Sequence, residues 1–200
     1  MTRRIPLFPL RTVLFPGGPM ALRIFEPRYV DMVGRCMRDS TGFAVMLLLE
    51  GAEAGGGVTS TARIGTEARI VDFDRLEDGL LGLTCLGVNR VRIVETSCEA
   101  DGLNVADVED LAPDTQTAVP DDCEHLVCAL RHLLPQLPAI YAQWVEPRYD
   151  DAVWVGNRLA ELSPFDALVR QGLLEMTDPL ERLRYLAPLV RLEPDSTTPH

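Results

Sequence analysis

The stretch MALRIFEPRYVDMVGRCM, residues 20–37, decides the fold, because the spacing of its apolar residues changes within it. Met20 to Phe25 is short and apolar, which is typical of a β-strand. Pro27 suits the first turn of a helix. The apolar residues that follow fall at i, i+3, i+4, i+7 and i+8, at Tyr29, Met32, Val33, Cys36 and Met37. The stretch therefore predicts a strand followed directly by a helix that buries one face.

The remainder of the first hundred residues predicts further short strands. The prolines in Ile5 to Phe15 indicate an edge strand or an entry segment there. Ile64 to Phe73 alternates with Glu67 facing solvent, and its phase reverses after Ile70, which indicates a bulge or an inversion of faces. Further strands are expected at Phe43 to Leu49, Leu81 to Val94 and Leu103 to Val108. Several short strands with one early helix indicate a small barrel-like sheet.

The second half of the chain predicts helices. Residues 101–122 carry seven acids and no base, which indicates a solvated linker or a docking surface for a basic partner. A leucine stripe then predicts a helix beginning near Pro120, and a second helix is expected from about Asp150. Two cap sequences predict the third and fourth helices, and they are Ser163-Pro164-Phe165-Asp166 and Asp178-Pro179-Leu180-Glu181.

Charge composition excludes several classes of protein. All 19 basic residues are arginine, and without lysine there is no P-loop lysine, Schiff-base lysine or Ser–Lys dyad. The formal net charge of −11 lies entirely in residues 101–200. Nucleic acid is therefore not expected as a partner, because its affinity comes from basic groups that neutralise phosphates.

The chain also shows no targeting signal. Pro6, Pro9 and Arg11 interrupt its N-terminal apolar residues, so no signal peptide is expected. The longest apolar run, Phe43 to Leu49, is far short of the roughly 20 residues that span a bilayer. The five cysteines contain no C-x-x-C spacing, which indicates reduced thiols. We therefore expect a cytoplasmic protein without a membrane partner.

Four segments resemble the N-terminal domain of the Lon protease family. IPLFPLRTVLFPG (residues 5–17) looks like the opening of that domain, and RIFEPRY (residues 23–29) matches its second signature. LGVNRVRI (residues 86–93) resembles a later strand motif, and residues 173–183 resemble the helical segment that closes the domain. The resemblance covers about residues 4–192, and the two signatures near the start are specific as a pair.

The resemblance implies an α+β fold, in which a six-stranded PUA-like β pseudo-barrel with one early helix is followed by a C-terminal α-helical bundle. We expect the barrel over residues 1–115, the bundle over residues 116–194 and a frayed tail over residues 195–200. In the full protease this region recognises substrates, while the ATPase and peptidase lie further along that chain. The resemblance thus implies a stand-alone, non-catalytic module that binds a protein or peptide and needs no cofactor.

Candidate binding residues are aromatic and charged side chains at the strand–helix junction and between two later helices, because aromatics and arginine are enriched at binding hot spots. Glu26 and Arg28 can instead form an ion pair that pins the helix to the sheet. Trp144 can instead pack between the domains. We predict that a cleft between barrel and bundle takes an apolar segment of a protein partner. The candidate residues are Phe8, Phe15, Arg23, Glu26, Arg28, Tyr29 and Trp144.

A metal-binding alternative stays open. His125, Cys128 and His132 share one helix face at i, i+3 and i+7, and these residue types ligate zinc. A structural zinc needs a fourth ligand, and no second cluster appears in the sequence, so we expect no metal. The alternative is a metal-binding protein or an enzyme that uses this face.

Two further possibilities concern catalysis and assembly. Asp72, Asp74, Glu77 and Asp78 could form an acid/base pair, but no histidine or nucleophile stands in their segment. We therefore predict solvated acids and no catalytic residues. A homo-oligomer whose copies fill one another's grooves also remains possible.

Overall fold

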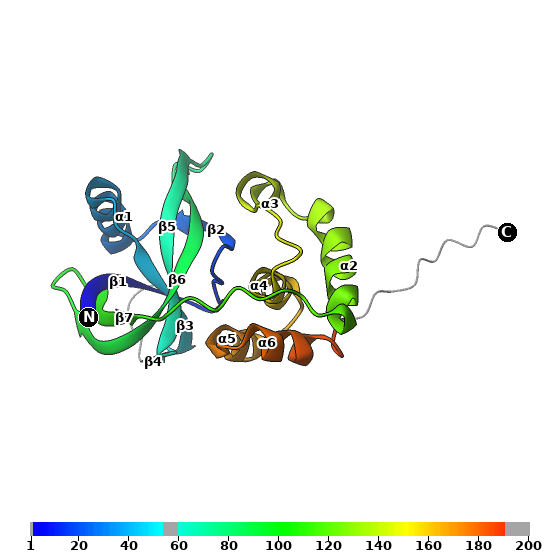
Figure 1. Cartoon of the computed structure of the whole chain (residues 1–200). Coiled ribbons are helices and arrows are strands. Elements are labelled where there is room, and N and C mark those ends of the chain that lie inside the picture. The colour runs from blue at the N-terminus through cyan, green and yellow to red at the C-terminus, as the bar shows by residue number, and fades with distance from the viewer. Residues whose placement is uncertain (1, 54–59, 191–200) are drawn as a thin grey trace.

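A β-barrel is followed by a group of helices in the computed structural model, which describes residues 2–53 and 60–190 (Figure 1). The predicted tail, residues 195–200, lies outside the described residues. The predicted α+β class is confirmed. The strands number seven among the described residues, one more than expected, because a two-residue strand pairs with β3. They are β1 (Thr2–Leu10), β2 (Pro19–Ile24), β3 (Phe43–Glu50), β4 (Ser60–Thr61), β5 (Ile64–Arg75), β6 (Leu81–Cys98) and β7 (Asn104–Asp110).

β1 closes the barrel. Its first half, Thr2 to Pro6, pairs antiparallel with β7, and its second half, Leu7 to Leu10, pairs parallel with β3. The ring therefore runs β1-β7-β6-β5-β3 and back to β1. The prediction of an edge strand or entry segment is wrong for β1. Prolines are tolerated here because each residue of β1 has one partner strand, so a missing N–H can face away from it.

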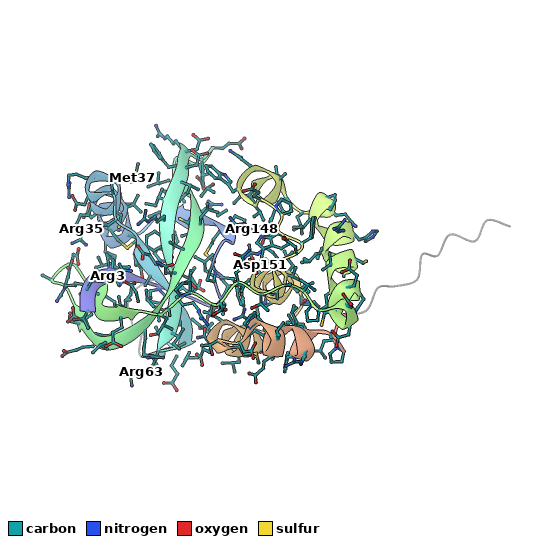
Figure 2. The ribbon with its side chains drawn as sticks, in the orientation of Figure 1. Arg3, Arg35, Met37, Arg63, Arg148 and Asp151 are labelled. Atoms are coloured by element: carbon teal, nitrogen blue, oxygen red, sulfur yellow. The ribbon has the colours of Figure 1, made fainter. Side chains whose placement is uncertain are left out.

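The early helix α1 (Pro27–Asp39) forms as predicted and packs on the barrel core. Tyr29, Met32, Val33 and Cys36 are buried. Met37 is 42% exposed, and Figure 2 labels it on α1, so its predicted burial is wrong. The reason is geometric, since a residue eight positions after Tyr29 is rotated about 80° from it around the helix.

Two bulges shape β5. The register with β6 shifts between Thr66 and Ala68 and again between Ile70 and Asp72. The second shift confirms the bulge that the sequence indicates after Ile70. The first shift lies within a run of four buried residues, so Glu67, expected to face solvent, is only 6% exposed and pairs with Arg3.

Among the described residues, the helical half contains one α-helix that the sequence analysis missed, the six-residue α3. Asp178 caps its helix as predicted, and its carboxylate accepts hydrogen bonds from two backbone N–H groups. The cap of the third helix is Asp166 rather than Ser163, because Ser163 ends the preceding helix. The helices are α2 (Glu124–Leu133), α3 (Ala139–Trp144), α4 (Ala152–Leu162), α5 (Ala167–Glu175) and α6 (Pro179–Leu186).

Apolar packing joins the barrel to the helices. Phe15, which is fully buried, and Leu47 belong to the same core cluster as Leu126, Leu159 and Leu183 of the helices. The space between the two halves is therefore filled by side chains at this contact.

The acidic stretch 101–122 is not simply a solvated linker. Its first part forms β7, and the following segment crosses from the barrel to the helices (Figure 1). Asp114 in that segment is 5% exposed and pairs with Arg90 of β6 and Arg182 of α6. An acid in this stretch therefore connects the two halves.

Candidate binding surface

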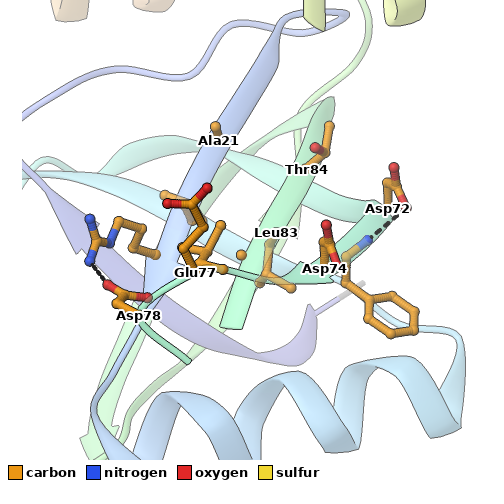
Figure 3. A pocket seen from close by; sticks show the side chains of 12 residues that line it. Ala21, Asp72, Asp74, Glu77, Asp78, Leu83 and Thr84 are labelled. Carbon is orange, nitrogen blue, oxygen red and sulfur yellow. Dashed lines mark hydrogen bonds and ion pairs between the residues drawn. The ribbon is translucent and has the colours of Figure 1, made fainter. Parts of the chain in front are cut away.

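One face of the strands β2, β6 and β5 forms the floor of a groove of about 680 Å³ (Figure 3). Side chains on paired strands share a face when their residues stand opposite each other. The strand registers create two such rows across the face. The first row is Ala21, Thr84 and Asp72, and the second is Arg23, Gly82 and Asp74.

The turn between β5 and β6 supplies one wall of this groove, through Leu76, Glu77 and Asp78. Gly82 leaves room for that wall, because a Cβ there would lie 2.8 Å from Cδ2 of Leu76. Asp78 forms an ion pair with Arg23, which ties the turn to β2. The groove is thus shaped by a small residue on its floor and an ion pair at its end.

Carboxylates dominate the charge of the groove. Asp72, Asp74, Glu77 and Asp78 line it with one guanidinium, that of Arg23, which gives a formal charge of −3. The sequence analysis treats these four as solvated acids, and all four are exposed. Among the described residues that line the groove there is no histidine, cysteine or serine. The arrangement therefore offers charge and apolar contact to a ligand.

A second pocket of about 200 Å³ lies on the other side of β2. Phe8 and Leu10 of β1, Leu22 of β2 and Tyr29 of α1 supply apolar walls, and Phe25 stands at the junction between β2 and α1. The two pockets share three consecutive residues of β2, so they adjoin. We call the combined set of residues that line either pocket the β2 surface.

Four of the seven predicted binding residues line the second pocket, and they are Phe8, Arg23, Glu26 and Tyr29. Phe15 is fully buried in the contact between the barrel and the helices, and it offers no surface to a partner. Trp144 is half-buried at the end of α3, outside both pockets. The structure therefore gathers the candidates at the barrel wall rather than between barrel and bundle.

Arg28 anchors the start of α1. Its Nη2 lies 2.9 Å from Oε2 of Glu26, and its Nη1 donates to the carbonyl of Gly102 at 2.8 Å. Its guanidinium also lies 4.7 Å from the ring centre of Tyr29. Burial raises the pKa of Tyr29, so its hydroxyl stays protonated at neutral pH. The Glu26–Arg28 pair thus supports the wall of the second pocket.

The histidine face of α2 receives no support as a metal site. His125, Cys128 and His132 are all exposed, and Nε2 of His125 lies 3.2 Å from the carbonyl oxygen of Ala187. In residues 2–53 and 60–190, no group of three or more His, Cys, Asp or Glu side chains is arranged to hold a metal ion. No helix in those same ranges is long and apolar enough to cross a membrane.

Sequence analysis missed two aromatic residues of the β2 surface. Phe25 is 58% exposed in the second pocket, and Phe73 is 56% exposed at the groove. The phase reversal of β5 gave no signal for the exposure of Phe73, because the bulge between Ile70 and Asp72 places Phe73 opposite the buried Leu83. For Phe25, the signal was an aromatic residue placed directly between a strand and a helix cap.

The fold and this surface define a barrel domain that carries an attached group of helices and an acidic, partly apolar groove. The family model of the ATP-dependent protease La (LON) substrate-binding domain matches residues 4–191, so the chain belongs to that family. The crystal structure of a Lon N-terminal domain protein from Xanthomonas campestris is similar, with a TM-score of 0.78 and 36% identity. The match covers 94% of this chain and 99% of that one.

Curated relatives are much longer than this chain. Lon protease 2 of Myxococcus xanthus is 27% identical over 93% of this chain, and the match spans 23% of that protein. Protein cereblon of Xenopus tropicalis is 32% identical over 66% of this chain, and the match spans 29% of it. The N-terminal domain of the Mycobacterium avium complex Lon protease, 18% identical with a TM-score of 0.64, shares the fold.

Proposed function

We propose that this chain binds exposed apolar segments of other polypeptides at the β2 surface, and that it is not an enzyme. The observation that carries the proposal is the pair of aromatic side chains, Phe25 and Phe73, each more than half exposed beside a pocket. Exposed aromatics that rim a groove are typical of a binding site, because covering them removes apolar area from water.

Other features support the same proposal. The matched family is a substrate-binding domain, which agrees with a protein partner. The residues that line either pocket, as far as the structure describes them, include no nucleophilic serine or cysteine and no histidine. We place this activity in the barrel domain, residues 1–115, with residues 116–194 as the helical domain. We further propose a cytoplasmic location, since Cys98 and Cys128 are exposed thiols, and no nucleic-acid or membrane partner.

Binding to an unfolded protein tests the proposal. Reduced, carboxymethylated α-lactalbumin is labelled with a fluorophore, and its anisotropy is followed as the full chain is added. We expect saturable binding, weakened about 5- to 30-fold by Phe25→Ser and by Phe73→Ser, as for aromatic hot spots.

Leu168→Ser on α5 is the matched control, because Leu168 is 68% exposed and lies outside the β2 surface. It removes an exposed apolar side chain of similar size and should leave the affinity unchanged. Equal weakening by Leu168→Ser and the two phenylalanine variants would contradict the proposed site. Absence of binding by the unsubstituted chain would contradict the function itself.

A further inference from the structure

β2 has a free edge. It pairs with β6 along its whole length, and within the described ranges no strand pairs with its other side. The ring of the barrel closes through β1, which leaves β2 outside the ring. A strand in this position presents unpaired backbone groups to whatever lies beside it.

The register shows which backbone groups face that edge. The N–H of Gly87 donates to the carbonyl of Gly18, so Gly18 faces β6. Alternate residues of a strand point their N–H and C=O groups to opposite sides. Because the register is regular from Pro19 to Ile24, Ala21 and Arg23 direct theirs to the free edge. The third outward residue is Pro19, which has no N–H to offer.

A pocket lies against this edge. The second pocket is lined by the consecutive residues Ala21 to Ile24 and, across from them, by Phe8 and Leu10 of β1. Tyr29 also lines it, and the buried Tyr29 hydroxyl has no hydrogen-bond partner within the described part of the chain. A peptide carbonyl beside β2 could accept from this hydroxyl, and an apolar side chain could enter the pocket.

Acidic side chains stand close to the same edge. Glu77 lines the groove together with Ala21 of β2, and Asp78 pairs with Arg23 of β2. Glu53 and Glu26 line the second pocket. The charged side chains beside β2 are therefore mainly carboxylates, which favours a basic side chain in the occupant.

We propose that the partner segment adds to the free edge of β2 as an extended strand, with apolar side chains toward the second pocket and alternate arginine or lysine side chains toward Glu77 and Asp78. The inference deepens the proposed function and rests on it. Main-chain hydrogen bonds give such strand addition its affinity, and the alternate side chains give it specificity.

A backbone-modified peptide tests the strand geometry without altering the protein. The probe is a fluorescein-labelled octapeptide, Gly-Val-Arg-Val-Arg-Leu-Arg-Gly, and the control is a peptide of the same composition with its arginines in one block. Two further versions carry N-methyl groups, one on the arginines and the other on the apolar residues. We expect one N-methylated version to bind at least about ten-fold more weakly and the other to bind almost unchanged, because alternate N–H groups face β2.

Variants of the protein test the edge and the charge. Ala21→Pro removes an outward N–H without removing a bond to β6 and should weaken the probe, whereas Ala21→Ser keeps the N–H and should not. Glu77→Arg should weaken the probe about ten-fold at low salt, and the loss should shrink at high salt. Glu146→Arg, at an exposed acid of the helical half, makes the same charge change and should have a small effect.

The outcomes separate the two proposals. Equal effects of both N-methylation patterns, or equal binding of the blocked-arginine control, would overturn strand addition. If unfolded α-lactalbumin still bound through Phe25 and Phe73, the proposed function would stand without it. If neither probe bound, both would fail. Tyr29→Phe should weaken the octapeptide without lowering thermal stability, since it removes an unpaired buried hydroxyl.

Discussion

Replacing Asp114 by asparagine should strongly destabilise the chain, because this carboxylate is held between two buried arginines. Arg182 Nη2 donates to its Oδ2 at 2.9 Å, and Arg90 donates to its Oδ1. The side chains of Asp114, Arg90 and Arg182 are 5%, 5% and 1% exposed. Asparagine keeps the size of the side chain but leaves two guanidiniums with no charge between them.

The expected magnitude follows from this burial. Breaking a buried ion pair on one side lowers the free energy of unfolding by about 3–5 kcal/mol. Each kcal/mol lowers Tm by about 2–4 °C in a chain of this size, so we expect a fall of about 6–20 °C. Burial lowers the pKa of Arg90 while Asp114 opposes that shift, so loss of the carboxylate removes what favours the charged guanidinium.

Differential scanning calorimetry of matched variants measures this effect. Asp110→Asn is the control, because Asp110 pairs with Arg3 at the surface and its side chain is 48% exposed. An exposed pair contributes about 1 kcal/mol or less, so this variant should lower Tm by no more than about 4 °C. If Asp114→Asn lowered Tm no more than Asp110→Asn did, the buried ion pairs would contribute no more to stability than an exposed pair.

Three other features give direct tests. A hydrogen bond from Arg3 is the main cause that lowers the pKa of Asp110. The ionised carboxylate therefore stabilises the fold above its ordinary pKa near 3.8, and this contribution is lost as the pH falls further. Below pH 4, the free energy of unfolding should thus depend less on pH for Asp110→Asn than for the unsubstituted chain. Gly87→Ala would place a Cβ against the backbone carbonyl oxygen of Phe15, and urea unfolding should show that the free energy of unfolding falls by about 1–3 kcal/mol or more. Wild-type stability of this variant would refute the close approach. Burial raises the pKa of Cys85 to about 12, so a thiol reagent should label the exposed Cys98 within the native state and Cys85 only in urea.

Local patterns predicted the elements that depend on nearby residues. The apolar spacing after Pro27 predicted α1, and Asp178 with Pro179 and Glu181 predicted the start of α6. Both rest on interactions within one or two helical turns. Glu67 shows the limit of such patterns, because a bulge sets its face, and Arg3 reaches it from a strand 64 residues away in sequence.

The candidate site could be predicted only in part, because it depends on which strands become neighbours. Alternation places Asp72 and Asp74 on one face of β5, but only the pairing with β6 brings them beside Thr84 and Gly82. The signature at residues 23–29 indicated part of the second pocket. Phe15 stands in an equally apolar stretch, yet the helices cover it completely. Burial by a distant element leaves no local signal.

The length of β6 explains why this barrel retains an open edge. Residues 81–86 of β6 pair with β2, and residues 91–98 pair with β7, so one strand has two successive neighbours on the same side. β7 continues into the ring through β1, whereas β2 has no such continuation among the described residues. Pro19 and Arg23 limit indiscriminate pairing, since proline and charge protect edge strands. A short edge flanked by a pocket and carboxylates therefore favours an extended segment with alternating apolar and basic side chains. A second copy of β2 is disfavoured, because it would bring its own Pro19 to the same edge.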